Sequence, residues 1–527
     1  MDSLIQNKYF GFLTQSNLQK LSKSKIFYGI FAVYFVSKLF YRLFLNPLNK
    51  IPGPWWARLT SLPFRISYAM GNGIKVSKKL HEKYGPISRI APDEISVADA
   101  SGIRKMLSSF RYKKSRKFEH VKVYHQSIFS TSDETFNKMR RRQIAPAYSH
   151  AGLDTVEDVI MENGIISLKK YLDSEIEKGN GVSTINYINA FQNLTSDVIG
   201  SLTFGKSFNA MGNNGHPIVT AVNRGRRLST VTLVFPFISD ILSLFPAIIN
   251  AKKLIIGYSL NVMDERKLAI QEGSYKTGKA DILQIYMDAV NTTSGKKLSK
   301  EELIDEMIIT LIGGTDTTSL TMTWLIHIYM LYPQIYKKVC DEVLEQFPDR
   351  SKPIRHHEAK QKLPYLVASV YECMRLRGVS ASGTFRETPA EGVELCGYNI
   401  PKGVDVSLYF EGAHHDSKIW ENPQSFNPDR FMGPEGEKMK KEVLVFATGI
   451  RICPGRNLAW YEILTVIPNL IRDYDISLPE GSIYTPKNLD PTRNNEPVII
   501  DDIDLIIRKP RYEKRDCNIV VKHRTFD

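Results

Sequence analysis

Apolar residues recur along this chain in patterns that predict many helices and a few short strands. The longest predicted helix spans residues 300–331 and is apolar on nearly every side, which is typical of a buried helix. Ser299 and Glu302 have the spacing of a capping box at its start, and Pro333 prevents its extension. A helix of roughly 32 residues is about 48 Å long, so we expect it to cross a whole domain.

Short stretches that alternate between apolar and polar residues predict strands at residues 87–90 and 94–97, and a further strand pair around residues 404–408. Residues 273–300 are mostly polar and include glycines, which indicates a surface connection before the long helix. Together these patterns predict a mainly α fold with small β-sheets.

The N-terminal region carries a possible membrane segment. Residues 26–45 form an apolar stretch of about twenty residues, enough to span a bilayer core. Lys38 and Arg42 interrupt it and could reach the interface, so a tilted span and a helix lying in the membrane surface both stay open. No small-residue cleavage site follows, which argues against a cleaved signal. We therefore expect a pre-anchor segment (1–25), an anchor helix (26–45) and a proline-rich hinge (46–54).

Composition and charge narrow the choice of function. A hydrophobic content of 43% in 527 residues is ample for a large core. The formal net charge of +14 could attract nucleic acid or an anionic membrane, but we find no nucleic-acid recognition motif. Five cysteines without close pairs argue against a disulfide framework and against a zinc site, and favour a reducing compartment.

One of these cysteines stands in a distinctive loop. Phe446, Gly449, Arg451, Cys453 and Gly455 follow the pattern Phe-x-x-Gly-x-Arg-x-Cys-x-Gly. The glycines allow a tight turn and close approach of the backbone to sulfur. A cysteine thiolate donates electron density to haem iron and favours cleavage of the O–O bond. A buried structural cysteine is the alternative.

This pattern resembles the haem-binding loop of the cytochrome P450 superfamily, and five fixed positions across ten residues make a chance match improbable. The resemblance implies that Cys453 is the axial ligand of the iron in haem b. It also implies that Arg451 faces a haem propionate and that Phe446 forms an apolar wall beside the ligand.

The middle of the predicted long helix contains a second motif. Gly313 and Gly314 cost helix stability unless something approaches the backbone closely, and dioxygen bound to iron would do so. Asp316 and Thr317 form an acid–alcohol pair that could relay protons to this oxygen. A threonine that bonds back to a carbonyl one turn earlier is the structural alternative. The segment resembles the oxygen-activating part of the central helix in the same superfamily.

Three charged residues are expected to have a structural role. Glu372 and Arg375 lie three residues apart, where they meet on one helical face. Arg430 lies in a segment that resembles the superfamily region whose arginine joins such a pair in a buried triad. Loss of one partner would leave a buried charge, at a cost of about 3–5 kcal/mol.

Two further arginines are expected to hold haem carboxylates by resemblance. Arg386 follows the paired-charge helix, and Arg141 matches the arginine of a Trp/His-x-x-x-Arg pattern. The first position of that pattern is Asn137 in this chain, which puts one propionate hydrogen bond in doubt. An ordinary solvated face is the alternative for the basic run around Arg141.

The resemblance implies one large haem-binding domain over residues 55–527, with the cytochrome P450 fold around a long central helix. It implies a monooxygenase that inserts one atom of O2 into a hydrophobic small molecule, such as a steroid, terpenoid or fatty compound, with steroid hydroxylation as the first specific hypothesis. Substrate contacts are expected from four ranges, which are residues 121–129, 307–311, 379–385 and 497–500.

Electrons are expected from NADPH through a separate flavoprotein, NADPH–cytochrome P450 reductase, with cytochrome b5 as an additional donor. On this chain, the docking face for the electron donor would be formed by basic residues, namely Lys138, Arg140, Arg142 and Arg456. The expected location is the endoplasmic reticulum membrane, with the catalytic domain in the cytosol.

Two other functions stay open. A haem-thiolate isomerase or dehydratase would need no reductase, but such enzymes tend to lack the acid–alcohol pair formed by Asp316 and Thr317. A non-catalytic haem protein, such as a gas sensor, would be expected to carry a signalling or partner-binding segment, and we find none in the sequence.

Overall fold

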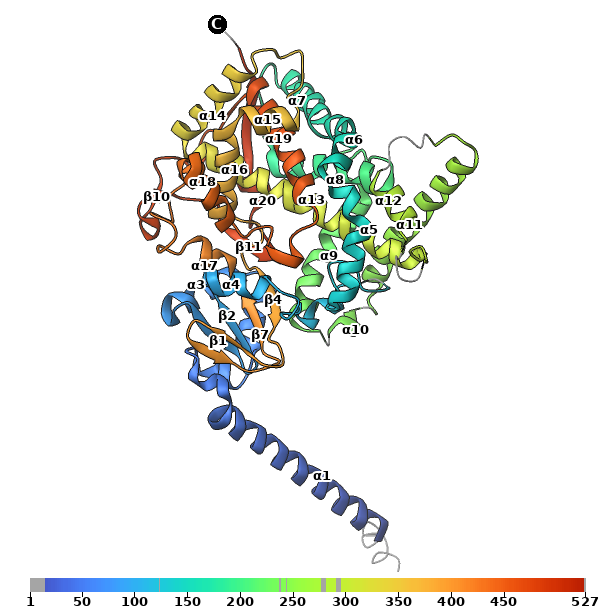
Figure 1. The fold of residues 1–527 in the computed structure, drawn as a ribbon, viewed down its shortest axis with the longest axis vertical. Coiled ribbons are helices and arrows are strands. Elements are labelled where there is room, and N and C mark those ends of the chain that lie inside the picture. Colours follow the sequence, from blue (N-terminus) through green and yellow to red (C-terminus); the bar gives the residue numbers. More distant parts are fainter. Residues whose placement is uncertain are drawn as a thin grey trace, which may run out of the picture.

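The computed structural model describes residues 15–122, 124–236, 238–242, 244–275, 281–290 and 295–525. Figure 1 shows a mainly helical body with a strand-rich corner, from which one N-terminal helix projects. The α-helices are α1 (Gln15–Phe40), α2 (Leu62–Ala69), α3 (Gly73–Tyr84), α4 (Ala100–Leu107), α5 (Glu134–Tyr148), α6 (His150–Met161), α7 (Ser167–Lys178), α8 (Tyr187–Phe204), α9 (Pro217–Val234), α10 (Ile238–Leu242), α11 (Pro246–Gln271), α12 (Ile282–Asp288), α13 (Lys300–Leu331), α14 (Pro333–Gln346), α15 (His356–Lys362), α16 (Pro364–Leu376), α17 (Phe410–His414), α18 (Gly433–Met439), α19 (Arg456–Asp473) and α20 (Glu513–Asp516).

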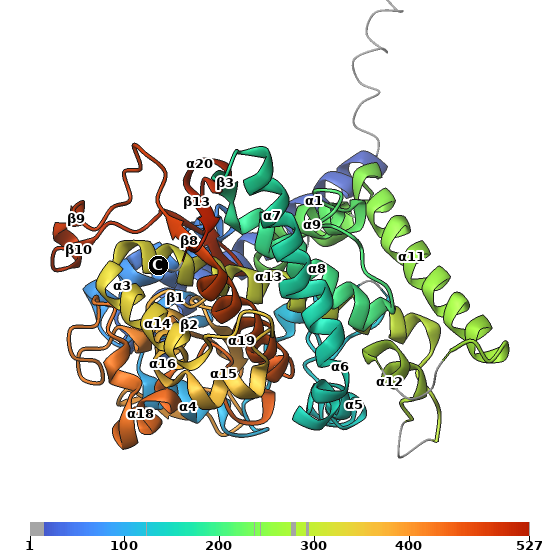
Figure 2. The same cartoon turned by 90° about the horizontal axis from the view of Figure 1, so that it is seen from above.

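The predicted long helix is confirmed as α13, which has 32 residues and a complete capping box between Ser299 and Glu302. Most of its side chains are buried, as expected for a helix that is apolar on nearly every side. It packs along α8, and Figure 2 shows the two helices side by side near the middle of the molecule. α13 therefore forms the central support of the fold.

The strands form small sheets. The largest has the order β1-β2-β7-β4, in which β2 and β7 are parallel and the other pairs antiparallel, and it confirms the strands predicted near residues 87–97 and 404–408. A second sheet, β3-β13-β8, joins the C-terminal strand to the helical body. The strands are β1 (Ile87–Ala91), β2 (Glu94–Val97), β3 (Ser183–Asn186), β4 (Thr384–Glu387), β5 (Val393–Leu395), β6 (Tyr398–Ile400), β7 (Asp405–Leu408), β8 (Tyr474–Ser477), β9 (Leu489–Asp490), β10 (Glu496–Pro497), β11 (Asp502–Leu505), β12 (Ile507–Pro510) and β13 (Asn518–His523).

The N-terminal helix differs from the prediction. It begins at Gln15 rather than at residue 26, because the polar residues before the apolar stretch are also compatible with a helix, and a short π-helical turn follows it at Tyr41–Leu45. The rest of the predicted pre-anchor segment, residues 1–14, lies outside the described residues. The stretch Phe27–Lys50 is long and apolar enough to cross a membrane, and most of its hydrophobic side chains are exposed, although Leu48 is buried.

The connection predicted at residues 273–300 also differs, because it contains the short helix α12. Asp281 begins this helix by accepting a hydrogen bond from the amide of Gln284 at 2.8 Å, and Ile282, Leu283 and Tyr286 are buried. This apolar spacing of one helical turn was overlooked among the surrounding polar residues.

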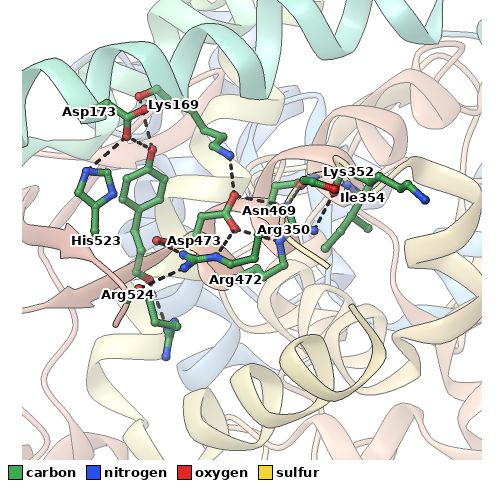
Figure 3. Close-up of polar contacts among 12 residues, drawn as sticks. Lys169, Asp173, Arg350, Lys352, Ile354, Asn469, Arg472, Asp473, His523 and Arg524 are labelled. Carbon is green, nitrogen blue, oxygen red and sulfur yellow. Dashed lines mark hydrogen bonds and ion pairs between the residues drawn. The ribbon is translucent and has the colours of Figure 1, made fainter. Parts of the chain in front are cut away.

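An ionic cluster fixes the end of α19 (Figure 3). Asp473, the last residue of α19, accepts hydrogen bonds from Lys169 of α7 at 2.7 Å and from Arg472 at 2.9 Å. Arg350 donates to both the side chain and the backbone carbonyl of Asp473. Arg524 donates to the backbone carbonyl of Tyr474, the residue that follows Asp473. The cluster therefore ties α7 and the C-terminal strand to α19, whose first residue follows the cysteine loop.

A buried ionic triad joins α16 to the 3-10 turn Pro428–Phe431. Glu372 accepts hydrogen bonds from Arg375 Nε at 2.7 Å and from Arg430 Nε at 3.2 Å. The side chains of Glu372 and Arg375 are fully buried, so each charge depends on the other for compensation. Arg375 also donates to three backbone carbonyls, those of His414, Pro423 and Ser425.

We predict that Glu372→Ala destabilises the fold by about 3–5 kcal/mol, because it leaves Arg375 buried without its counter-ion. The matched control is Glu435→Ala, which removes an exposed ion pair with Lys438 and should cost about 1 kcal/mol or less. Chemical denaturation of both variants measures the difference. Equal losses of stability would show that the triad contributes nothing beyond a surface ion pair.

Candidate active site

A cavity of about 1600 Å³ lies between α13 and the loop that precedes α19. Its volume exceeds the range of about 300–1,000 Å³ that is usual for a single small ligand. Residues from the predicted cysteine loop, the predicted central-helix motif and the predicted arginines all line it, namely Phe446, Arg451, Cys453, Gly455, Gly313, Gly314, Asp316, Thr317, Arg141 and Arg386. The fold thus brings together residues that are more than 300 positions apart in the sequence.

Cys453 reaches the cavity from the loop between the 3-10 turn Gly449–Arg451 and α19. Its amide donates to the carbonyl of Phe446 at 2.8 Å, and its side chain is exposed because it faces the open cavity. The cavity lies inside the protein, and this loss of bulk water around the thiol raises its pKa. Hydrogen bonds from the amides of Gly455 and Arg456 lower the pKa. Two backbone donors therefore point at the sulfur, where they would stabilise a thiolate.

The two loop glycines have different reasons to be glycine. Gly449 has φ +69°, and a Cβ there would lie 2.2 Å from the carbonyl oxygen of Leu107, so no other residue fits this turn. Gly449 does not line the cavity and acts through the shape of the loop. Gly455 has an ordinary φ, and its Cβ would lie 4.0 Å from the sulfur, so the expected conformational demand is absent there. It is instead the N-cap residue that directly precedes α19.

Four cations gather at one end of the cavity. Arg141 comes from α5, Arg386 from β4, Arg451 from the cysteine loop and Lys114 from the segment before α5. Arg451 pairs with Glu134 at 2.8 Å, but the other three form no ion pair within the part of the chain that the structure describes. The sequence analysis missed Lys114, because an isolated lysine in a loop carries no recognisable pattern.

The positive charge of this cluster is only partly compensated, because Glu134 is its one ion-pair partner among the described residues. Burial, with the nearby Arg451 adding to the shift and Glu134 opposing it, lowers the pKa of Arg386 to about 10. Burial also holds the pKa of Lys114 well below its ordinary value, with Arg386 and Arg451 adding to the shift. Buried cations of one sign are costly unless an anion joins them. The cluster would therefore fit the carboxylates of a haem whose iron Cys453 would bind.

The motif in α13 faces the cavity from the other side. At Gly313 a Cβ would meet no atom within 4 Å, so the helix surface is open there, as expected for close approach of a ligand. The reason for glycine at position 314 is different. A Cβ there would lie 2.5 Å from Ile199 of α8, so Gly314 allows the two helices to pack closely.

The acid–alcohol pair is split between two environments. The Thr317 hydroxyl donates to the carbonyl of Gly313 at 2.6 Å, the structural alternative considered for this residue, but its oxygen still faces the cavity. Asp316 is buried and accepts a hydrogen bond from Gln192 of α8 at 3.3 Å. Both side chains line the same cavity as Cys453.

A second buried acid lies in the cavity wall. Glu462 of α19 is 1% exposed, and neither carboxyl oxygen has a hydrogen-bond partner among the described residues. Burial raises its pKa to about 8, and the nearby hydroxyl of Thr318 opposes the shift only in part. The carboxyl is therefore mostly protonated at neutral pH. The signal in the sequence was one acidic residue within an apolar helix, which we did not single out.

Three of the four ranges expected to contact the substrate line the cavity, while their contact with a substrate stays a prediction. Residues from 121–129, 307–311 and 379–385 line the cavity. The range 497–500 was wrong, because it turns away toward α13, where the amide of Ile500 donates to His327. The turn between β11 and β12 takes its place. Helices α9 and α11 supply further walls, and the sequence analysis missed these lining residues, which include Leu505, Ile506, Ile507, Thr220, Leu228, Ala247, Ile248 and Ala251.

The docking face predicted from basic residues needs one correction. Arg140 is 1% exposed and pairs with Glu302 at 2.7 Å and with Glu306 at 3.2 Å, so it cannot meet a partner protein. It was misplaced because a run of three arginines looks uniformly solvated, whereas successive helical residues point in different directions. The remaining members of the face are exposed, namely Lys138, Arg142 and Arg456.

We predict that Glu462→Gln stabilises the protein in a pH-dependent way. The folded pKa lies above the usual value of about 4.3, so the unfolded chain releases this proton first, and wild-type stability falls as the pH rises toward 8. The amide removes this loss, so the stability gain should grow from pH 5 to pH 8, to a few kcal/mol. Thermal unfolding across this range measures it, with the exposed Glu480→Gln as control. A gain that is constant with pH would contradict the assignment.

Comparisons with known proteins agree with the site. The family model described as Cytochrome P450 matches residues 51–497. Similar proteins include the cytochrome P450 monooxygenases helB1 and helB3 of Aspergillus fumigatus. They are 31% and 30% identical, over 94% and 95% of this chain and 86% and 98% of the relatives. The monooxygenase LUC2 of a Fusarium species is 25% identical over 88% of this chain and 91% of its own length. The chain therefore belongs to the cytochrome P450 family and is an oxidoreductase of the monooxygenase type.

Proposed function

We propose that this protein is a membrane-anchored haem-thiolate monooxygenase that inserts one oxygen atom of O2 into a hydrophobic small molecule. The observation that carries the proposal is the meeting of Cys453, the cation cluster and Thr317 around one cavity. Neither a sensor nor a carrier would need a hydroxyl and two buried acids beside the ligand.

Different residues of the cavity would bind different parts of the haem. Cys453 would bind the iron through its thiolate, and Lys114, Arg141, Arg386 and Arg451 would hold the carboxylates. Haem, when bound, supplies the activation of O2, in which two electrons and two protons send one oxygen atom to the substrate and the other to water. The amides of Gly455 and Arg456 stabilise the negative charge on sulfur.

Residues of the chain itself can supply the protons that the reaction needs. The Thr317 oxygen can accept a hydrogen bond from the cavity while its own hydrogen is held by Gly313. Asp316 lies next to it in the sequence and is oriented by Gln192. Glu462, with its pKa near 8, holds a proton at neutral pH beside Thr318. Protons can therefore be supplied by residues of two helices, α13 and α19, that line the same cavity.

The walls of the cavity determine the class of substrate. Beyond the haem site they are largely aliphatic, contributed by α9, α11, α13 and the turn between β11 and β12. Ile308, Ile309 and Ile312 of α13 and Ile506 of the turn are examples. An apolar substrate gains from burial on such walls. We therefore propose a steroid, terpenoid or fatty compound, with steroid hydroxylation as one reaction to test.

The surface supports the electron supply and the location that we propose. The exposed Lys138, Arg142 and Arg456 give a positive face near the cysteine loop, which suits an acidic flavoprotein such as NADPH–cytochrome P450 reductase, with cytochrome b5 as an additional donor. The apolar stretch Phe27–Lys50 would anchor the catalytic domain, residues 55–527, on the cytosolic side of the endoplasmic reticulum.

The direct test uses membranes that contain this chain and the reductase, supplied with NADPH and a panel of steroids, terpenoids and fatty acids. We expect a product heavier by one oxygen atom. It should disappear in Cys453→Ala and fall by roughly a hundredfold in Thr317→Ala, the usual contribution of a proton-transfer group. Mass spectrometry measures the product, and NADPH consumption is followed in parallel.

The matched control is Thr321→Ala, which lies one turn further along α13, bonds back to the carbonyl of Thr317 and does not line the cavity. It should keep most of the activity. A product that forms without NADPH would contradict the monooxygenase and favour the isomerase or dehydratase. Equal losses in Thr317→Ala and Thr321→Ala would contradict the proposed role of Thr317.

A further inference from the structure

One segment of the cavity wall is held by side chains whose role is not yet explained. Residues 124–131, which we call the strap, run between the segment that carries Lys114 and the start of α5. Ser127, Ile128 and Phe129 of the strap line the cavity. The strap belongs to no helix or strand, so its backbone groups need partners elsewhere.

Two adjacent carboxylates of α13 satisfy three amides of the strap. Asp305 accepts hydrogen bonds from the amides of Tyr124 at 3.2 Å and His125 at 2.8 Å. Glu306 accepts from the amide of Ile128 at 2.9 Å. Asp305 is 4% exposed and Glu306 1% exposed. The contact of Glu306 with Ile128 is buried, whereas Tyr124 and His125 are themselves exposed.

The carbonyls of the strap face the cation cluster. Arg451 donates to the carbonyl of Thr131 at 3.0 Å, and Lys114 donates to that of Phe129. Asn137 of α5 donates to the carbonyl of Ile128 at 2.8 Å. Three amides of the strap are thus held by α13, and three of its carbonyls are held at the same end of the cavity that would bind the haem carboxylates. The amides of Ser127, Ser130 and Thr131 bond within the strap itself.

Asn137 explains the departure from the Trp/His-x-x-x-Arg pattern. Its side chain is 1% exposed and bridges two groups, since it donates to Ile128 and accepts from Arg141 Nε at 3.2 Å. It therefore does not reach outward to a carboxylate of its own. Instead it orients Arg141 and fastens the strap at the same time.

The burial of Glu306 is costly and needs a reason. Burial raises its pKa to about 7, although Arg140 lies 3.2 Å away and opposes the shift. A hydrophobic residue at this position would avoid the cost but would leave the amide of Ile128 buried without an acceptor. The buried carboxyl thus serves two groups, the amide of Ile128 in the strap and the guanidinium of Arg140.

We propose that Asp305, Glu306 and Asn137 are positioning residues that fix the strap, and that the strap sets how closely Ile128 and Phe129 approach a molecule in the cavity and how fast that molecule enters. This inference rests on the proposed function in one respect, because it takes this cavity as the substrate site. The position of the strap itself can be tested without any turnover.

The first test is hydrogen exchange of the full-length holoenzyme, read from peptides that cover the strap. In Glu306→Leu the amide of Ile128 loses its acceptor, and we expect exchange in the strap to become about tenfold faster or more, a change equivalent to about 1.4 kcal/mol. Glu306→Gln keeps an acceptor oxygen without the charge and should exchange like the wild type.

The matched control is Glu302→Gln, which bonds to the same Arg140 but makes no hydrogen bond to the strap among the described residues. It should leave exchange in the strap unchanged. Asp305→Leu provides an independent variant should Glu306→Leu fail to fold, and it should speed exchange at the amides of Tyr124 and His125. Exchange that stays at the wild-type rate in both leucine variants would overturn the proposal.

The second test uses 4-phenylimidazole as a probe of entry, followed by its absorbance change in stopped flow. We expect binding about tenfold faster in Asp305→Leu, with the same final spectrum, because the entrance is loosened while the residues of the haem site are kept. Unchanged entry rates despite faster exchange would overturn the role in access. Neither result depends on whether the chain oxidises a substrate, so a failure here is distinguishable from a failure of the proposed function.

Discussion

Buried positive charge at one end of the cavity is the constraint on which the rest of the structure depends. Lys114, Arg141, Arg386 and Arg451 come from four separate parts of the chain, and only Glu134 forms an ion pair with them within the described residues. Such a cluster is unfavourable by itself, because desolvation and like charges both oppose it. It becomes favourable when a molecule with carboxylates enters the cavity. Binding of the anionic group and stability of this region are therefore coupled.

The other elements follow from the need to present one sulfur opposite one helix. Gly449 gives the cysteine loop a turn that no other residue could adopt, and α19 continues from the loop and is fixed at its far end by the cluster around Asp473. α13 faces the sulfur across the cavity with the open surface of Gly313. The strap connects these two sides, since three of its amides bond to α13 and its carbonyls bond to the cations and Asn137.

The sequence predicted those features that depend on neighbouring residues. The capping box and Pro333 defined α13 to the residue, and the spacing of the cysteine pattern defined the loop. It did not predict features that depend on the approach of distant elements. Lys114 and Glu462 acquire their roles only when α5, α13 and α19 meet, and the true cavity wall at the β11–β12 turn depends on how the C-terminal strands pair.

Resemblance also misled where one residue type has several uses. Gly314 looked like a site for dioxygen but serves helix packing, and Arg140 looked like part of a docking face but is buried between two glutamates. In each case the residue type was compatible with both roles, and only its direction in space distinguished them. Asn137 is the opposite case. It departs from the family pattern, and the structure shows that it bonds to both the strap and Arg141.

The measurement that tests the central claim most directly is the absorption spectrum of the reduced carbon monoxide complex, recorded on the purified full-length chain and on Cys453→His. The account predicts the spectrum of a thiolate-bound haem in the wild type and of an imidazole-bound haem, or no bound haem, in the variant. A thiolate spectrum that survives in Cys453→His, or folded wild-type protein that binds haem without a thiolate spectrum, would contradict it.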